Sequence, residues 1–135
     1  MTTTLPSHTA TISIDAPPAA VLDLVADPEQ LPRWAPGFAR EVRRDGEDWL
    51  VSGDTAAGER RVCIRIDRDL GVVDYLTPEG ILGAASRVIA NAAGSEMLFT
   101  VFFPPEASEP DREAQRAVVA DELAAVRELA SSSAR

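Results

Sequence analysis

The segment 9–34 constrains the fold more than any other part of the chain. Residues 9–14 alternate Thr or Ser with Ala or Ile, and this period of two is typical of a half-buried strand. Pro17 and Pro18 stop the strand and suit the first turn of a helix, whose apolar residues share one face. A second short helix ends at Trp34. A strand that leads directly into two short helices predicts a domain in which helices pack on a sheet.

The rest of the chain predicts an antiparallel sheet followed by one long helix. Short turns rich in Gly or Asp, such as Asp45-Gly46 and Ala57-Gly58, separate apolar or alternating segments. The predicted strands span residues 38–44, 49–53, 61–67, 72–77, 86–92 and 96–103. Residues 111–130 place their apolar side chains on one broad helical arc. The predicted fold class is therefore α+β, with a curved antiparallel sheet of six to seven strands wrapped around a long C-terminal helix.

The length of 135 residues fits one domain with a substantial core. We expect residues 1–7 to be a loose lead-in, residues 8–130 to form a single ligand-binding domain, and residues 131–135 to be a frayed tail. The sequence has no run that reads as a secretory signal or a bilayer span, so the expected location is cytoplasmic.

The charge and the scarcity of two residue types narrow the classes of function. Lys and Arg number 13 against 22 Asp and Glu, a net charge of −9. This balance argues against nucleic acid and against an anionic membrane surface as partners. Cys63 is the only cysteine and His8 the only histidine, which excludes an intrachain disulfide and a His-based zinc site. We expect no metal and no organic cofactor, and a monomer or homodimer.

Two sets of residues carry a resemblance to a known group of proteins. The first set is Ala16-Pro17 with Leu31-Pro32-Arg33-Trp34. The second set is Gly71-Val72-Val73-Asp74, Arg87-Val88, Asn91, Gly94-Ser95-Glu96 and Phe99-Thr100. With these residues the chain resembles the SRPBCC superfamily, the helix-grip fold of START lipid-binding domains, birch-pollen-type allergens and bacterial polyketide cyclases. The second set is similar to a bacterial group of polyketide cyclases or dehydrases.

The resemblance implies that the chain binds a small hydrophobic, polyketide-like or aromatic molecule in an internal cavity. For an enzyme of this kind it implies cofactor-free cyclisation or dehydration of that molecule. The superfamily holds both enzymes and pure binders, so a non-catalytic carrier or sensor of a lipid-like ligand is the alternative. A third class, a module that docks through its acidic surface, would have a filled core.

The predicted strand register gathers several polar residues on one face of the sheet. If residues 92–95 form a tight turn, Asn91 lies opposite Glu96 and Arg87 lies opposite Thr100. A similar turn after the preceding strand would place Asp74 opposite Arg87. This patch either lines the cavity, where Arg87 would bind a ligand oxygen, or lies on the outer, solvated face. The other face is more apolar, which favours the outer position for the patch.

Glu122 and Tyr75 are the other candidates for catalysis, beside Arg87. Glu122 projects from the middle of the apolar arc of the last helix, where burial would raise its pKa toward neutrality. Alternatively, its side chain extends past the edge of the arc to solvent. Tyr75 is predicted to line the cavity, where its hydroxyl would contact a ligand, or to be a core tyrosine bonded to the backbone.

Further candidates would contact the ligand through apolar surface. Trp34 is predicted either to cover the mouth of the cavity or to anchor the second short helix. The full set of predicted ligand-binding residues is Trp34, Asp74, Val88, Asn91, Phe99, Val119, Leu123 and Val126. Alanines at 84, 85, 90, 92 and 93 crowd one hairpin, and such small side chains leave space for a ligand-sized pocket of about 300 Å3 or more. Ordinary alanine bias would explain them equally well.

Overall fold

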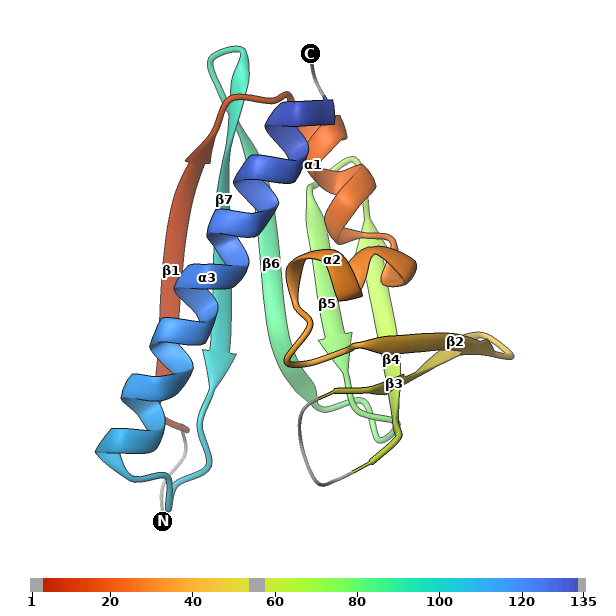
Figure 1. The fold of residues 1–135 in the computed structure, drawn as a ribbon, viewed down its shortest axis with the longest axis vertical. Coiled ribbons are helices and arrows are strands. Elements are labelled where there is room, and N and C mark those ends of the chain that lie inside the picture. The colour runs from red at the N-terminus through yellow and green to blue at the C-terminus, as the bar shows by residue number, and fades with distance from the viewer. Residues whose placement is uncertain (1–3, 54–57, 134–135) are drawn as a thin grey trace.

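The computed structural model describes residues 4–53 and 58–133, which form one curved antiparallel sheet with helices on a single face (Figure 1). In chain order the elements are β1 (Ser7–Ile14), α1 (Pro18–Val25), the 3-10 helix η1 (Pro28–Gln30), α2 (Leu31–Trp34), β2 (Glu41–Asp45), β3 (Asp48–Ser52), β4 (Arg60–Asp67), β5 (Val72–Leu76), β6 (Leu82–Asn91), β7 (Gly94–Phe102) and α3 (Glu109–Ser133).

The sheet has seven strands in the order β1-β7-β6-β5-β4-β3-β2, and every neighbouring pair is antiparallel. The long helix α3 crosses the concave face of the sheet, and α1 packs beside its C-terminal half (Figure 1). The predicted α+β architecture, with two short helices after the first strand and a sheet around the last helix, is confirmed. The sheet must bury its apolar face, and α3 with α1 and α2 covers it.

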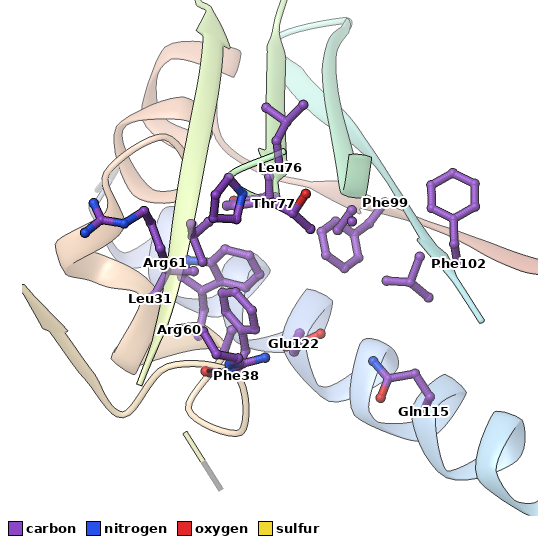
Figure 2. A pocket seen from close by; sticks show the side chains of 18 of the residues that line it. Leu31, Phe38, Arg60, Arg61, Leu76, Thr77, Phe99, Phe102, Gln115 and Glu122 are labelled. Atoms are coloured by element: carbon purple, nitrogen blue, oxygen red, sulfur yellow. Dashed lines mark hydrogen bonds between the residues drawn. The ribbon is translucent and has the colours of Figure 1, made fainter. Parts of the chain in front are cut away.

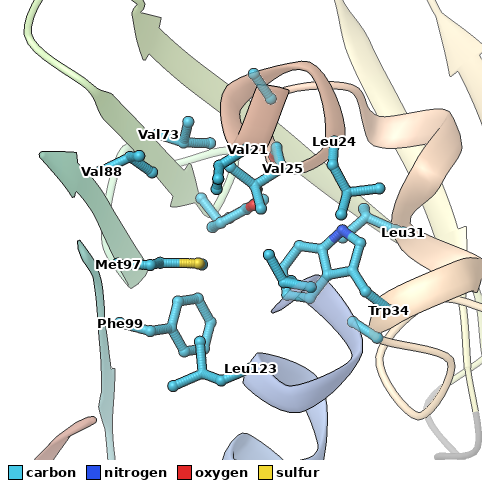
Figure 3. Close-up of a cluster of buried hydrophobic side chains, with 14 of the residues drawn as sticks. Val21, Leu24, Val25, Leu31, Trp34, Val73, Val88, Met97, Phe99 and Leu123 are labelled. Carbon is cyan, nitrogen blue, oxygen red and sulfur yellow. Dashed lines mark hydrogen bonds between the residues drawn. The ribbon is translucent and has the colours of Figure 1, made fainter. Parts of the chain in front are cut away.

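The apolar core lies where α1, α2 and α3 meet the sheet (Figure 3). Val21 and Val25 of α1 face Met97 and Phe99 of β7 across the core, and all four are nearly inaccessible to solvent. Trp34, at the end of α2, packs edge-to-face on Phe99 with ring centroids 6.2 Å apart. This packing anchors the short helices and leaves the region nearer the N-terminal half of α3 as the place for a pocket.

The register of the two longest strands differs from the predicted one by two residues. Asn91 pairs with Gly94 and Arg87 pairs with Leu98, because the turn consists of residues 92–93 alone. Ala92 adopts a φ of 52°, a left-handed conformation that alanine seldom takes and that the sequence did not signal. Asp74 pairs with Ala85 in the same way. A shift of two residues leaves every side chain on its predicted face.

Other boundaries differ at the ends of elements. The last helix begins at Glu109 rather than residue 111, because the Ser108 hydroxyl caps it by accepting a hydrogen bond from the Asp111 amide at 3.2 Å. The same helix continues to Ser133, beyond the predicted end at Ala130. The predicted turn at Ala57-Gly58 lies partly outside the described residues, since Ala57 is not described.

Ser95 supports the junction that holds β1, α1 and β7 together. It is 1% exposed, and its hydroxyl donates to the Ala16 carbonyl at 2.7 Å. We expect Ser95→Ala to lower the free energy of unfolding by about 1–2 kcal/mol, because the buried carbonyl loses its partner. Urea unfolding measures this. Ser13→Ala, which removes an exposed hydroxyl bonded to Glu96, is the control and should change stability by less than about 0.5 kcal/mol. Equal losses in both variants would contradict the prediction.

Candidate ligand-binding site

A pocket of about 630 Å3 opens between α2, one end of strands β4 to β7 and the N-terminal half of α3 (Figure 2). Its lining residues are Leu31, Trp34, Ala35, Phe38, Arg60, Arg61, Val62, Tyr75, Leu76, Thr77, Pro78, Glu79, Gly83, Ala84, Phe99, Val101, Phe102, Gln115 and Glu122. Most of this lining is apolar, and the volume lies within the range that small organic ligands occupy in proteins.

The small residues of β6 keep the pocket open. Ala84 lies between Tyr75 of β5 and Val101 of β7 on the concave face, and Gly83 precedes it. A larger side chain at Ala84 would project into the space that now separates the sheet from α3, since Ala84 shares the face of Tyr75 and Val101. The alanine-rich hairpin therefore contributes directly to the pocket through Ala84, while Ala90, Ala92 and Ala93 are exposed elsewhere.

Glu122 is the buried carboxyl group of the pocket. It lies on α3, is 8% exposed, and has no hydrogen-bond or ion-pair partner among residues 4–53 and 58–133. Burial raises the pKa of Glu122 to about 7, and the negative charge of neighbouring Asp121 adds to the shift. Such a group is present in both protonation states near neutral pH, which is the property that a general acid or base requires.

Tyr75 lines the pocket but uses its hydroxyl within the fold. The hydroxyl donates to the Val25 carbonyl at 2.9 Å and so ties β5 to the end of α1. Burial raises the pKa of Tyr75 above its ordinary value, and the charge of Glu122 acts in the same direction. The phenol therefore keeps its proton at neutral pH.

Arg60, the first residue of β4, also lines the pocket and was not predicted from the sequence (Figure 2). Its guanidinium stacks on the Phe38 ring, 5.0 Å from the centroid, and donates to the Phe38 carbonyl at 3.0 Å. The available signal was strand alternation, because Arg60 shares its parity with Val62 and Ile64 on the apolar face. Neighbouring Arg61 has the opposite parity and forms ion pairs with Asp45 and Asp48.

The predicted polar patch lies on the convex face of the sheet, away from α3. Asp74 is 2% exposed there because two arginine side chains cover it. Arg87 donates to one carboxylate oxygen at 2.7 Å, and Arg65 donates to the other at 2.7 and 3.2 Å. Burial would raise the pKa of Asp74, but the hydrogen bonds and charges of the two arginines outweigh it and hold the pKa below its ordinary value.

The convex position means that Arg87, Asp74 and Asn91 do not line the pocket. Asn91 instead donates to Glu96 at 3.2 Å near the end of the same face. Strand alternation is compatible with either face for this patch, and the patch lies on the solvated one because apolar residues that meet α3 fill the concave face.

The remaining predicted ligand-binding residues divide between the pocket and the core. Trp34 and Phe99 line the pocket. The four others are buried in the adjoining core and do not line it: Val88, Val119, Leu123 and Val126. Phe38, Thr77 and Gln115 line the pocket without having been predicted, because a loop, a strand end and a helix face come together there only in the folded chain.

The chain is similar to proteins of one described family along nearly its whole length. The family model for polyketide cyclase / dehydrase and lipid transport proteins matches residues 6–130. The chain belongs to this family. The predicted SRPBCC membership is thereby confirmed, and family membership indicates a hydrophobic ligand without naming it.

Solved structures share the fold of this family member at low sequence identity. The XoxI protein from Bacillus cereus aligns with a TM-score of 0.71 and 16% identity, over 92% of this chain and 94% of that one. Protein NE0264 from Nitrosomonas europaea aligns with a TM-score of 0.69 and 14% identity, over 96% of each chain. Protein TTHA0849 from Thermus thermophilus aligns with a TM-score of 0.64 and 17% identity, over 96% of this chain and 100% of that one. The comparison with curated proteins finds no match.

Within residues 4–53 and 58–133, no three His, Cys, Asp or Glu side chains lie together as a metal site would require. None of the described helices is long and apolar enough to cross a bilayer.

Proposed function

We propose that the protein binds one small hydrophobic molecule, aromatic or polyketide-like, in the pocket between the sheet and α3. The observation that carries the proposal is the open pocket of about 630 Å3, whose lining is mostly apolar. An apolar surface of this extent in contact with water is unfavourable, and a hydrophobic ligand that covers it would be stabilised by its burial. The family of the chain points to the same class of ligand.

We further propose that Glu122 transfers protons to and from the bound molecule. In a dehydration, the carboxylate would take a proton from the carbon beside a carbonyl group and return it to the departing hydroxyl, so that water leaves and a double bond forms. In a cyclisation, the pocket would hold a flexible substrate in the reactive conformation, an orientation effect of several kcal/mol. Both reactions need a group that changes protonation near pH 7, and burial gives Glu122 that property.

A non-catalytic carrier is the second candidate. It is favoured by the scarcity of reactive groups at the pocket: the Tyr75 hydroxyl is bonded to the Val25 carbonyl, and Arg87 lies on the convex face. An enzyme would bind its ligand but fail to convert it when Glu122 is replaced by Gln. A carrier would release its ligand chemically intact with either residue at this position.

Extraction of the purified full chain, followed by mass spectrometry, tests ligand binding directly. We expect a co-purified apolar molecule that is missing from an identically treated sample of unfolded protein. Native mass spectrometry should give one molecule per chain. A protein that co-purifies with nothing and takes up no apolar probe would contradict the proposal.

Filling the pocket provides a test by mutation. We expect Ala84→Phe to weaken binding of an apolar probe such as anilinonaphthalene sulfonate by about tenfold or more, because the ring would occupy ligand space. Fluorescence titration measures the dissociation constant. Ala90→Phe, at an exposed position of the same strand, is the matched control and should bind as the wild type does. Equal affinities in all three proteins would place the probe outside the pocket.

A further inference from the structure

Two groups of opposite charge border the pocket without pairing with each other. Glu122 lies on α3 with Gln115, and Arg60 of β4 lies beside Phe38 of the loop before β2 (Figure 2). Neither Glu122 nor Arg60 has an ion-pair partner in the described part of the chain. Other arginines of this molecule, such as Arg43 and Arg116, pair with carboxylates at the surface, so the two groups at the pocket stand apart from the general pattern.

The guanidinium of Arg60 is held in a fixed orientation but does not use all of its N–H groups in hydrogen bonds within the described structure. Stacking on Phe38 fixes its plane, and one of its five N–H groups is used by the Phe38 carbonyl. Its Nε–H is buried and has no acceptor among the described residues. This Nε–H is closed to the pocket as well as to water, so a ligand would meet the remaining Nη–H groups of Arg60, whose half-buried side chain lines the pocket. Such a fixed guanidinium recognises a carboxylate better than a flexible lysine would.

The other charged residues of the pocket do not offer the same chemistry. Arg61 is engaged by Asp45 and Asp48 of the β2–β3 hairpin. Glu79 is exposed at the mouth, where water solvates its charge. Among the described lining residues, the pocket therefore presents one available cation and one buried carboxyl group, and most of the remaining lining is apolar.

We propose that the ligand is an aromatic or similarly apolar acid whose carboxylate binds Arg60 and whose hydroxyl group contacts Glu122. This ligand class rests on the proposed binding function and makes it specific. One negative charge on the ligand matches the guanidinium of Arg60. A hydroxyl suits Glu122 because it can donate to the ionised carboxylate and can also accept from the protonated acid, so the contact persists on both sides of neutrality.

Four naphthalene probes test this ligand class: a hydroxynaphthoic acid, naphthoic acid, naphthol and naphthalene. Calorimetric or fluorescence titration of the full chain gives their dissociation constants. We expect the hydroxy acid to bind most tightly, and loss of its carboxylate to weaken binding about tenfold or more, as for one charge-assisted hydrogen bond. Loss of the hydroxyl should weaken binding several-fold.

Variants assign each preference to its residue. In Arg60→Gln the ratio of the naphthoic acid and naphthalene dissociation constants should fall to about one, and Arg60→Lys, which keeps the charge, should restore part of the preference. Glu122→Leu should abolish only the preference for the hydroxyl. Arg43→Gln and Glu128→Gln remove exposed charges away from the pocket and serve as controls. Thermal unfolding of each variant establishes that it is folded.

The outcomes separate the ligand class from the binding function. Naphthalene and naphthol binding as tightly as the acids would overturn the ligand class and leave the pocket function standing. A carboxylate preference that survives in Arg60→Gln would overturn the role of Arg60. Failure of every probe, naphthalene included, to bind the wild-type protein would remove the binding function and the ligand class together.

Discussion

Replacing Asp74 by alanine is expected to lower the free energy of unfolding by about 2–3 kcal/mol. Asp74 is 2% exposed and accepts hydrogen bonds from both Arg65 and Arg87 across three adjacent strands. Without the carboxylate, two guanidinium groups face each other with no anion between them. Their side chains are 62% and 43% exposed, so water can solvate the charges left behind and the loss stays below that of a fully buried pair.

Urea unfolding of Asp74→Ala, with Glu128→Ala as an exposed-carboxylate control, measures this effect. The control should lie within about 0.5 kcal/mol of the wild type. Asp74→Asn should lose a similar amount as Asp74→Ala, because it keeps the shape of the side chain but not the charge. A loss below about 0.5 kcal/mol in both Asp74 variants would mean that the ion cluster contributes nothing net.

The pH dependence of the Asp74 effect has a defined sign. The pKa of Asp74 in the folded protein lies below its ordinary value of 3.8. Its contribution to stability is therefore complete above that value and is lost as the pH falls through the lower, folded pKa. The difference between the wild type and Asp74→Asn should be constant near neutrality and should shrink only in acid below about pH 4.

The order and type of the elements could be predicted because they depend on signals between residues that are close in the sequence. Pro17 and Pro18 set the start of α1 through their restricted φ angles, and alternation along residues 9–14 set the burial of β1. The register of β6 and β7 was off by two residues because it depends on one left-handed residue, Ala92. Nothing in the identity of an alanine indicates that conformation, and a glycine or asparagine there would have done so.

The site was harder to predict because a pocket depends on how segments that are distant in the sequence pack, and on which space their side chains leave empty. Glu122 could be placed on the apolar arc of the last helix because the period of an α-helix alone determines which residues share a face. Whether Glu122 meets packed side chains or open space depends on the curvature of the sheet and on the small side chain of Ala84, which lies far from Glu122 in the sequence. The role of Arg60 could not be predicted for a related reason. Its partner Phe38 lies in the loop before β2, and the two side chains stack only in the folded chain.

Replacing Glu122 by glutamine is expected to change how stability depends on pH. The pKa of Glu122 is about 7 in the folded protein against an ordinary value of 4.5. Between these values the unfolded chain has lost the proton while the folded one keeps it, so the stability of the wild type falls as the pH rises. The fall amounts to roughly 3 kcal/mol across the window and stops above the folded pKa. Glutamine cannot ionise, so its variant lacks this component.

The measurement is the difference in unfolding free energy between Glu122→Gln and the wild type from about pH 4.5 to pH 8. Over this range the unfolding free energy of Glu122→Gln should rise relative to that of the wild type by roughly 3 kcal/mol. For Glu128→Gln, at an exposed position of α3, the difference from the wild type should not change with pH. Parallel profiles would mean that Glu122 ionises as an ordinary surface carboxyl does.

Burial is the main cause of the raised pKa of Glu122, and the charge of Asp121 adds to it. Arg60, Arg61 and Glu79 border the same pocket but are not among the causes of the shift. Leucine at position 122 would avoid this cost to the fold, so the retention of a carboxyl group there supports the proposed role of Glu122 in proton transfer or ligand recognition.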